Sequence, residues 1–237
     1  MKLSFEYGTN VIKFDLIYKK RKTLEIRIEP PNVVTVIAPM GLSEQKVLEQ
    51  VKTKSRWIVR KLSEVKDIKY KPIKKEFVNG EVFMYLGLNY RLQIVIEPTV
   101  SKPIVSLTDD KFVISTSTTD EAILYKVMEQ WYRSKAQEKI GERVAYYSHK
   151  LNKTPKNIKI KEQKKRWGSC SSLGNLNFNW KCIMAPASVL DYLVVHEMCH
   201  LFHMNHSKDF WNMVASILPD YKQRKEWLKK HGVRMSL

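Results

Sequence analysis

The sequence is poor in cysteine and contains no long uncharged apolar run. Its 237 residues include three cysteines, Cys170, Cys182 and Cys199, and no C-x-x-C pair. This count argues against a disulfide framework or a zinc ribbon, so we interpret the thiols as reduced core residues. No segment reaches the roughly 18 apolar residues that a membrane helix needs, and the first ten residues contain no signal-peptide core. These absences predict a cytoplasmic protein without a membrane partner.

Negative charge is also scarce. The chain has 42 Lys and Arg against 24 Asp and Glu, a net charge of +18. Residues 1–80 carry 18 against 9 and residues 141–237 carry 17 against 7, whereas residues 81–140 carry 7 against 8. The excess favours an anionic partner, which could be a nucleic acid, a nucleotide, a ribosome or an acidic polypeptide. A solvated basic surface explains it equally well, because no nucleic-acid motif accompanies the charge.

The first half of the sequence has the pattern of strands. Apolar and polar residues alternate, or β-formers cluster, in the segments 11–18, 24–29, 33–38, 81–86, 90–97 and 111–116. A hairpin is expected around Pro30-Pro31-Asn32, and another turn is expected at Gly87. One helix, capped by Ser43 and continuing to Leu62, precedes a lysine-rich connector over residues 66–75.

From Asp120 onward helical spacing dominates. A helix is predicted from an Asp120 cap to about Lys150, and others are predicted after Pro186 and after Ser207. A last basic helix should end near Gly232. Short strands are predicted at residues 158–161 and 175–180, with turns at Gly168 and Gly174. The fold class is therefore α+β.

The predicted helix after Pro186 contains the segment His196-Glu197-Met198-Cys199-His200. Residues four apart share one face of a helix, so His196 and His200 can bind one metal ion. Glu197 is offset by about 100° and can reach the water position as a general base. Zn²⁺ is the expected ion, because three protein ligands and an open position make a catalytic zinc site. A zinc that only supports the fold would have no need of Glu197.

Two further histidines compete for the place of third ligand. On a straight helix His203 would stand roughly 10 Å along the axis from His196, too far for one ion. His206 can fold back if the chain turns first, and Asn205 tolerates the left-handed conformation that ends helices. We therefore predict His206 as the third ligand and place His203 beside the site or on the surface. A ligand role for Cys199 is open but disfavoured.

Several short motifs occur in one order around this helix. They are Arg166-Trp167-Gly168-Ser169-Cys170, Asn179-Trp180, Ala185-Pro186, Asp191-Tyr192, His196-Glu197-x-x-His200, Asn205-His206-Ser207 and Phe210-Trp211. Together they resemble the YgjP-like metallopeptidase domain family, which is related to SprT-like and WLM zinc proteases. The resemblance implies Zn²⁺ held by His196, His200 and His206, with Glu197 as the base. It also implies a polypeptide substrate that is held as an added strand.

The resemblance and the motif together give the predicted organisation. Residues 1–118 form a strand-rich region with one helix. Residues 119–237 form a zincin-like metal-binding hydrolase domain that consists of helices and a short sheet. Residues 175–180 are the candidate edge strand for substrate, although an ordinary core hairpin fits them equally well.

The predicted function is a zinc-dependent hydrolase, with a metallopeptidase favoured. A metal-dependent nucleotide pyrophosphatase or a nucleic-acid-associated zinc protein is the alternative, because eight Lys and Arg lie between Lys150 and Arg166. The Arg166 side chain could meet an anionic group, but we favour a structural role in which it pairs with an internal carboxylate such as Asp191. The tryptophans Trp167, Trp180 and Trp211 are expected to belong to the core.

Overall fold

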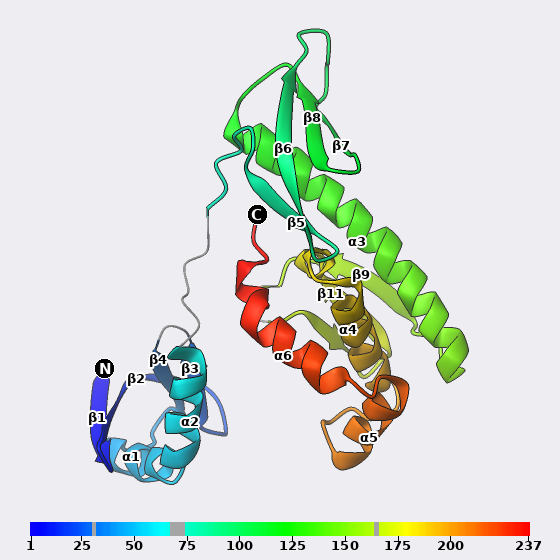
Figure 1. Ribbon diagram of the computed structural model, residues 1–237. Helices are drawn as coiled ribbons and strands as arrows, with labels where there is room; N and C mark the ends of the chain where they lie inside the picture. Colours follow the sequence, from blue (N-terminus) through cyan, green and yellow to red (C-terminus); the bar gives the residue numbers. More distant parts are fainter. Residues whose placement is uncertain (30–31, 67–73, 164–165) are drawn as a thin grey trace. The chain divides into compact units, whose positions relative to one another are not determined.

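The computed structural model describes residues 1–29, 32–66, 74–163 and 166–237. The chain divides into two compact units, Met1–Lys71 and Pro72–Leu237, and each has its own hydrophobic core (Figure 1). The predicted Pro30-Pro31 turn, most of the predicted connector and the Lys164-Lys165 pair lie outside the described residues. The chain is a mixed α and β protein with a strand-rich N-terminal half and helices in the C-terminal half, as predicted.

Unit 1 is a four-stranded sheet with two helices. Its elements are β1 (Lys2–Tyr7), β2 (Asn10–Lys19), β3 (Glu25–Glu29), β4 (Val33–Pro39), α1 (Glu44–Lys52) and α2 (Ser55–Lys66). The strand order is β1-β2-β4-β3, in which β2 and β4 are parallel and the other pairs are antiparallel. The helices bury Val47, Val51 and Ile58 against sheet residues such as Val36, which makes the core of this unit.

The prediction of one helix from Ser43 to Leu62 is wrong, because this segment forms α1 and α2. Ser43 is the N-cap as expected, and its Oγ accepts a hydrogen bond from the Lys46 N–H at 3.4 Å. At the break, the Thr53 hydroxyl donates to the Gln50 carbonyl at 2.7 Å and the Ser55 hydroxyl donates to the Lys52 carbonyl at 2.6 Å. Such bonds compete with the helical ladder while the apolar spacing continues.

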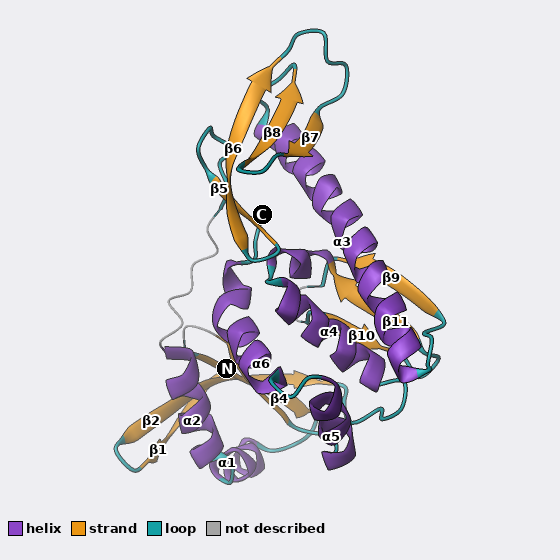
Figure 2. Ribbon diagram, turned by 45° about the vertical axis from the view of Figure 1, so that its right-hand side comes forward, coloured by secondary structure: helices purple, strands orange, loops and turns teal. Residues whose placement is uncertain are grey.

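Unit 2 contains two sheets and most of the helices (Figure 2). The first sheet, in the order β5-β6-β8-β7, consists of β5 (Val82–Tyr85), β6 (Leu88–Ile96), β7 (Ile104–Leu107) and β8 (Lys111–Thr116). The second, in the order β10-β11-β9, consists of β9 (Asn157–Lys161), β10 (Gly168–Cys170) and β11 (Asn175–Asn179). The helices are α3 (Glu121–Leu151), α4 (Ala187–Cys199), α5 (Lys208–Ile217), α6 (Tyr221–His231) and the 3₁₀ segments η1 (Trp180–Met184) and η2 (Gly232–Arg234).

Helix α3 spans unit 2 from the first sheet to the second (Figure 1). Its predicted start is confirmed, since the Asp120 carboxylate accepts from the backbone N–H groups of Ala122 and Ile123. One buried side of α3 carries Tyr132, whose hydroxyl donates to the Met84 carbonyl at 2.7 Å. The predicted division at residue 118/119 falls inside unit 2, between β8 and α3, and stays a prediction about domain organisation.

Most of the other predicted strands are confirmed, including the antiparallel pair β3 and β4. The turn between β5 and β6 is also confirmed, with Leu86 at φ 47° and Gly87 at φ 83°. Strands β1, β7 and β10 were not predicted. The assignment of Gly168 to a turn is wrong, because this residue begins β10. Within the described ranges, no helix has both the length and the apolar character of a membrane span.

Candidate metal centre

Helix α4 carries the first four residues of the motif, His196 to Cys199, through the core of unit 2. It is buried on nearly every side, because its apolar residues are not confined to one stripe. Its start is tied to the β5–β6 turn, where the Leu86 and Gly87 N–H groups donate to carbonyls of η1 at 2.9 and 3.1 Å. A Cβ atom on Gly87 would lie 2.8 Å from Pro186, the residue that caps α4. The turn and the helix therefore fit only with glycine at this position.

The chain returns to the site immediately after α4. His200 is the C-cap, and one further turn ends with the His203 N–H donating to the Cys199 carbonyl at 3.0 Å. The prediction that Asn205 adopts the left-handed conformation is wrong, because it is not one of the three described non-glycine residues with positive φ. Instead, the Asn205 side chain accepts from the Ser207 N–H at 3.2 Å, and Ser207 caps α5. The loop still brings His206 back to the helix.

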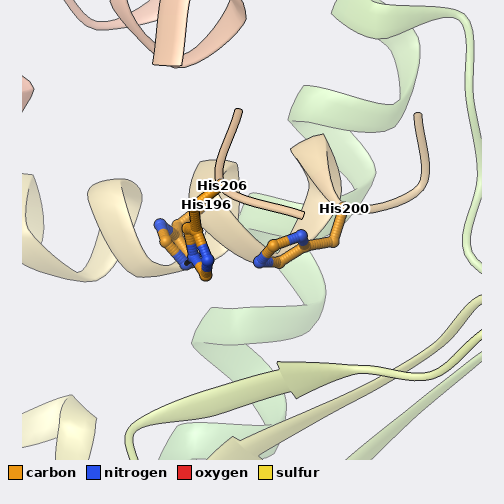
Figure 3. Close-up of side chains that lie close together, drawn as sticks. All are labelled: His196, His200 and His206. Atoms are coloured by element: carbon orange, nitrogen blue, oxygen red, sulfur yellow. Dashed lines mark hydrogen bonds between the residues drawn. The ribbon is translucent and has the colours of Figure 1, made fainter. Parts of the chain in front are cut away.

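The histidines predicted as ligands, His196, His200 and His206, meet at one point (Figure 3). One ring nitrogen from each lies within 4.8 Å of the others. The Nε2 atoms of His196 and His206 are 3.0 Å apart. Nitrogens bound to one tetrahedral zinc lie roughly 3.3 Å apart, given bonds near 2.0–2.1 Å. The cluster is therefore compact enough to hold one small metal ion.

The backbone of His203 fixes the tautomer of His200. The two residues are joined by a 2.9 Å contact between His200 Nδ1 and the His203 carbonyl. A carbonyl only accepts, so Nδ1 carries the proton and Nε2 keeps its lone pair. A metal-binding histidine characteristically donates its second nitrogen in this way. The sequence indicated no role for the His203 backbone.

Aromatic side chains hold the three imidazoles in place. The Phe210 ring stacks on His200 with centroids 4.5 Å apart, and Trp211 stacks on His206 at 5.5 Å. The Trp211 ring also stacks with Tyr221, with centroids 5.4 Å apart, and the Lys225 ammonium lies 4.3 Å from its centroid. Trp211 was expected to be an ordinary core residue, whereas it directly contacts a predicted ligand.

The electrostatic environment favours uncharged imidazoles. Burial, with the nearby His200, His206 and Lys225 charges, lowers the pKa of His196 to about 3. Burial, with the nearby His200 and Lys225, also lowers the pKa of His206. Both groups are therefore neutral near pH 7, the form that binds a metal.

Glu197 is a buried carboxyl beside this cluster. Its exposed fraction is 4%, and burial raises its pKa to about 8 against the opposing charge of Arg166. Strand β10 lies against it: a Cβ on Gly168 would come within 2.5 Å of Glu197 Oε1. Only a glycine lets the strand approach this closely, which gives a physical reason for the Gly in the Trp167-Gly168-Ser169 motif.

Strands β10 and β9 form the two edges of the second sheet, so the prediction of residues 175–180 as an edge strand is wrong. Strand β11 is central, between β10 and β9. The antiparallel pair β10 and β11 has hydrogen bonds from Asn179 N–H to Trp167 O and from Ser171 N–H to Asn175 O. Hydrogen-bonded positions alternate along such a ladder, so every second residue of β10 has its backbone N–H and C=O directed away from β11. These residues are Gly168 and Cys170.

The comparisons with known proteins identify the family. The sequence matches the family described as "YgjP-like, metallopeptidase domain" over residues 22–231. The chain belongs to this family. The resemblance predicted from the motifs is thereby confirmed, and membership implies a metallopeptidase that uses a divalent metal ion and acts on polypeptides.

Two solved structures are similar to part of this chain. The metallopeptidase zymogen of Pyrococcus abyssi abylysin is 18% identical with a TM-score of 0.36, covering 38% of this chain and 93% of its own. The zymogen of Methanocaldococcus jannaschii jannalysin is 22% identical with a TM-score of 0.32, covering 38% and 90%. Likenesses of this size carry no argument about fold or function. No curated protein matches the sequence.

Two further expectations about this YgjP-like chain are settled by side-chain contacts. The prediction that Arg166 pairs with Asp191 is wrong, because Asp191 accepts two hydrogen bonds from Arg143, at 2.5 and 3.1 Å. Arg166 is exposed, and its charge acts on Glu197 instead. Cys199 is fully buried, and among the described residues the candidate metal group consists of histidines alone.

Proposed function

We propose that this metallopeptidase is a zinc enzyme in which His196, His200 and His206 hold the ion and Glu197 is the general base. The single observation that carries the proposal is the convergence of three imidazole nitrogens beside a buried carboxyl. The donor set fits zinc, which favours nitrogen ligands in a small tetrahedral site. The neutral state of His196 and the fixed tautomer of His200 supply the lone pairs that such an ion needs.

The residues of the chain divide the chemical work. When bound, the ion would polarise the scissile carbonyl, acidify the attacking water and lower the pKa of the Glu197 carboxyl. Glu197 takes the proton of the attacking water and passes it to the leaving amine. The backbone groups of Gly168 and Cys170 hold the substrate as an added strand on the free edge of β10.

A mutation of the base tests the proposal. Glu197→Gln keeps the shape of the side chain and removes its basicity, so we expect full zinc content and peptide cleavage reduced at least a hundredfold. Zinc is measured by elemental analysis and cleavage by mass spectrometry on an unbiased peptide library. Retained cleavage in the variant, or a metal-depleted protein whose cleavage is restored by another divalent ion and not by zinc, would overturn the proposal.

The same experiment addresses the nucleotide alternative. It is favoured by one observation, the exposed Arg166 whose charge acts on Glu197, because a guanidinium can receive a phosphate. A panel of nucleoside triphosphates replaces the peptides. Phosphate release that exceeds the Glu197→Gln background, without peptide cleavage, would assign the site to phosphoanhydrides.

A further inference from the structure

Unit 1 has two adjoining hollows that share the side chains of Thr53, Lys54 and Trp57. The larger hollow has a volume of about 800 Å³, and the smaller about 450 Å³. We call the two together the Trp57 surface. It extends from the start of β3 across the junction of α1 and α2. None of its residues belongs to the candidate metal centre.

The break between α1 and α2 gives the surface its form. Ile58 turns inward and is fully buried in the core of unit 1, so the preceding Trp57 points outward and remains 36% exposed. Leu24, Ile26 and Leu42 give the larger hollow part of its lining, and the rest includes polar residues such as Gln50 and Thr53. An exposed indole beside such a hollow offers a flat surface on which a planar ring can stack.

The rim of the Trp57 surface is positively charged. Lys22 and Lys54 line the larger hollow, and Arg56 and Arg60 line the smaller one. Among the described residues that line either hollow, none is Asp or Glu. The acid nearest along β3, Glu25, is itself paired with Arg21 and Arg27 at 2.7 and 2.9 Å. Unit 1 as a whole carries 16 Lys and Arg against 8 Asp and Glu.

We propose that the Trp57 surface binds single-stranded nucleic acid, with a base stacked on Trp57 and the neighbouring phosphates on Lys54 and Arg56. Stacking platforms flanked by cations are the means by which proteins hold single strands without reading their sequence. A duplex keeps its bases stacked on each other, so it has no free ring for the indole. Carboxylate side chains alone, as in poly-glutamate, would use the cations but offer no planar ring to stack on the indole.

Binding is measured with the full-length Glu197→Gln chain, so that hydrolysis does not interfere. Fluorescence anisotropy of a labelled 20-nucleotide oligo(dT) is followed from low to physiological salt. Trp57→Ala should weaken binding by about 5- to 150-fold, the range for loss of one stacked base. Lys54→Gln/Arg56→Gln should flatten the slope of log K against log salt by about 1.4, the value for two lost phosphate contacts on a single strand.

A matched variant controls for charge alone. Lys2→Gln/Lys13→Gln removes two exposed lysines from β1 and β2, on the side of the sheet away from β3. It should leave affinity within twofold of the parent, and circular dichroism checks that each variant is folded. Equal losses of affinity in both double variants would overturn the proposal, because they would show that the oligonucleotide is attracted by the overall positive charge of the chain.

Two competitors test the chemical class of the partner. A 20-base-pair duplex and poly-glutamate should each displace the oligonucleotide at least tenfold less well than unlabelled oligo(dT). If the duplex displaces the labelled oligonucleotide as effectively as unlabelled oligo(dT) does, stacking on Trp57 is excluded. If poly-glutamate competes better, the partner is an acidic polypeptide. These outcomes do not depend on the metal centre, so failure here leaves the proposed peptidase function untouched.

Discussion

The Glu197 carboxyl lies so close to β10 that position 168 has room only for hydrogen. A methyl group there would come within 2.5 Å of Glu197 Oε1. Gly168→Ala should therefore displace the carboxyl or the strand and reduce peptide cleavage at least tenfold, while zinc content stays near that of the wild type. Gly141→Ala is the control, because a Cβ there meets nothing within 4 Å on a helix that alanine favours. Peptide cleavage by Gly168→Ala at the wild-type rate would show that this contact is dispensable.

The exposed His206 ring stacks on the Trp211 ring, with centroids 5.5 Å apart and an interplanar angle of 28°. Without it His206 samples more orientations, so Trp211→Ala should weaken zinc binding by roughly 10- to 100-fold, the usual effect of losing a residue that orients a ligand. Competition with a chromophoric chelator measures the affinity. Trp227→Ala is a matched control, because Trp227 stacks on His231, which is outside the histidine cluster. Equal losses in both variants would contradict the positioning role.

The depressed pKa of His196 has a consequence for the metal-free protein. In the unfolded chain this group takes up a proton near pH 6.5, whereas in the folded chain it does so only near pH 3. The unfolded state binds more protons between these values, so His196 stabilises the fold fully above pH 6.5 and less as the pH falls. Its contribution should decline by at most about 1.4 kcal/mol per pH unit.

Urea unfolding of the chelator-treated protein at several pH values between 7 and 4 measures this decline. Other groups titrate in the same range, so the informative quantity is the difference between the wild type and His196→Gln. The free energy of unfolding should fall more steeply with acidification in the wild type. Parallel curves for the two proteins would contradict the prediction.

At the scale of elements, α3 and α4 are joined by the ion pair of Arg143 and Asp191. Arg143→Gln and Asp191→Asn should each destabilise unit 2 by about 1 kcal/mol, a modest value because both side chains are partly exposed. A double-mutant cycle should give a coupling of similar size. The same cycle with Arg166→Gln in place of Arg143→Gln should be additive. Coupling only in the Arg166 cycle would restore the pairing expected from the sequence.

Elements that are determined by local signals could be predicted from the sequence. The caps Ser43, Asp120 and Ser207 and the Gly87 turn depend on neighbouring residues, and all are found as expected. The helix break at Thr53 could not be predicted, because the apolar spacing continues through it. Nor could β10, since a three-residue strand has no alternation to detect and its place at the sheet edge depends on distant pairing.

The candidate site divides in the same way. Helical spacing and the limited reach of a metal ion were enough to bring together His196, His200 and His206, which lie within ten residues of one another. The contacts around them were not accessible to such reasoning. Gly168 meets Glu197 across 29 positions, and Trp211 faces His206 only because the Asn205 turn takes one of several possible forms.

For the whole molecule, the extent of each core sets the boundaries of independent folding. Every buried member of the unit 1 core lies before residue 72, and every buried member of the other core lies after it. The second core includes both Phe112 of β8 and Tyr132 of α3, whose rings are 5.9 Å apart. These cores support a boundary at residue 71/72, whereas the division at 118/119, expected from the motif and the resemblance, stays a prediction.

Two truncations distinguish these boundaries. Residues 72–237 should unfold cooperatively and bind zinc with an affinity within a few fold of the full chain, because their core is intact. Residues 119–237 lose the ring of Phe112, which lies 4.8 Å from Trp131, and the Met84 carbonyl that accepts from the Tyr132 hydroxyl. Their core would be exposed along α3, so we expect no cooperative transition by circular dichroism. Cooperative unfolding and zinc binding by residues 119–237 would instead establish the strand-rich region as a dispensable domain. We do not expect this result, because α3 would then have to be stable with one aromatic face open to water.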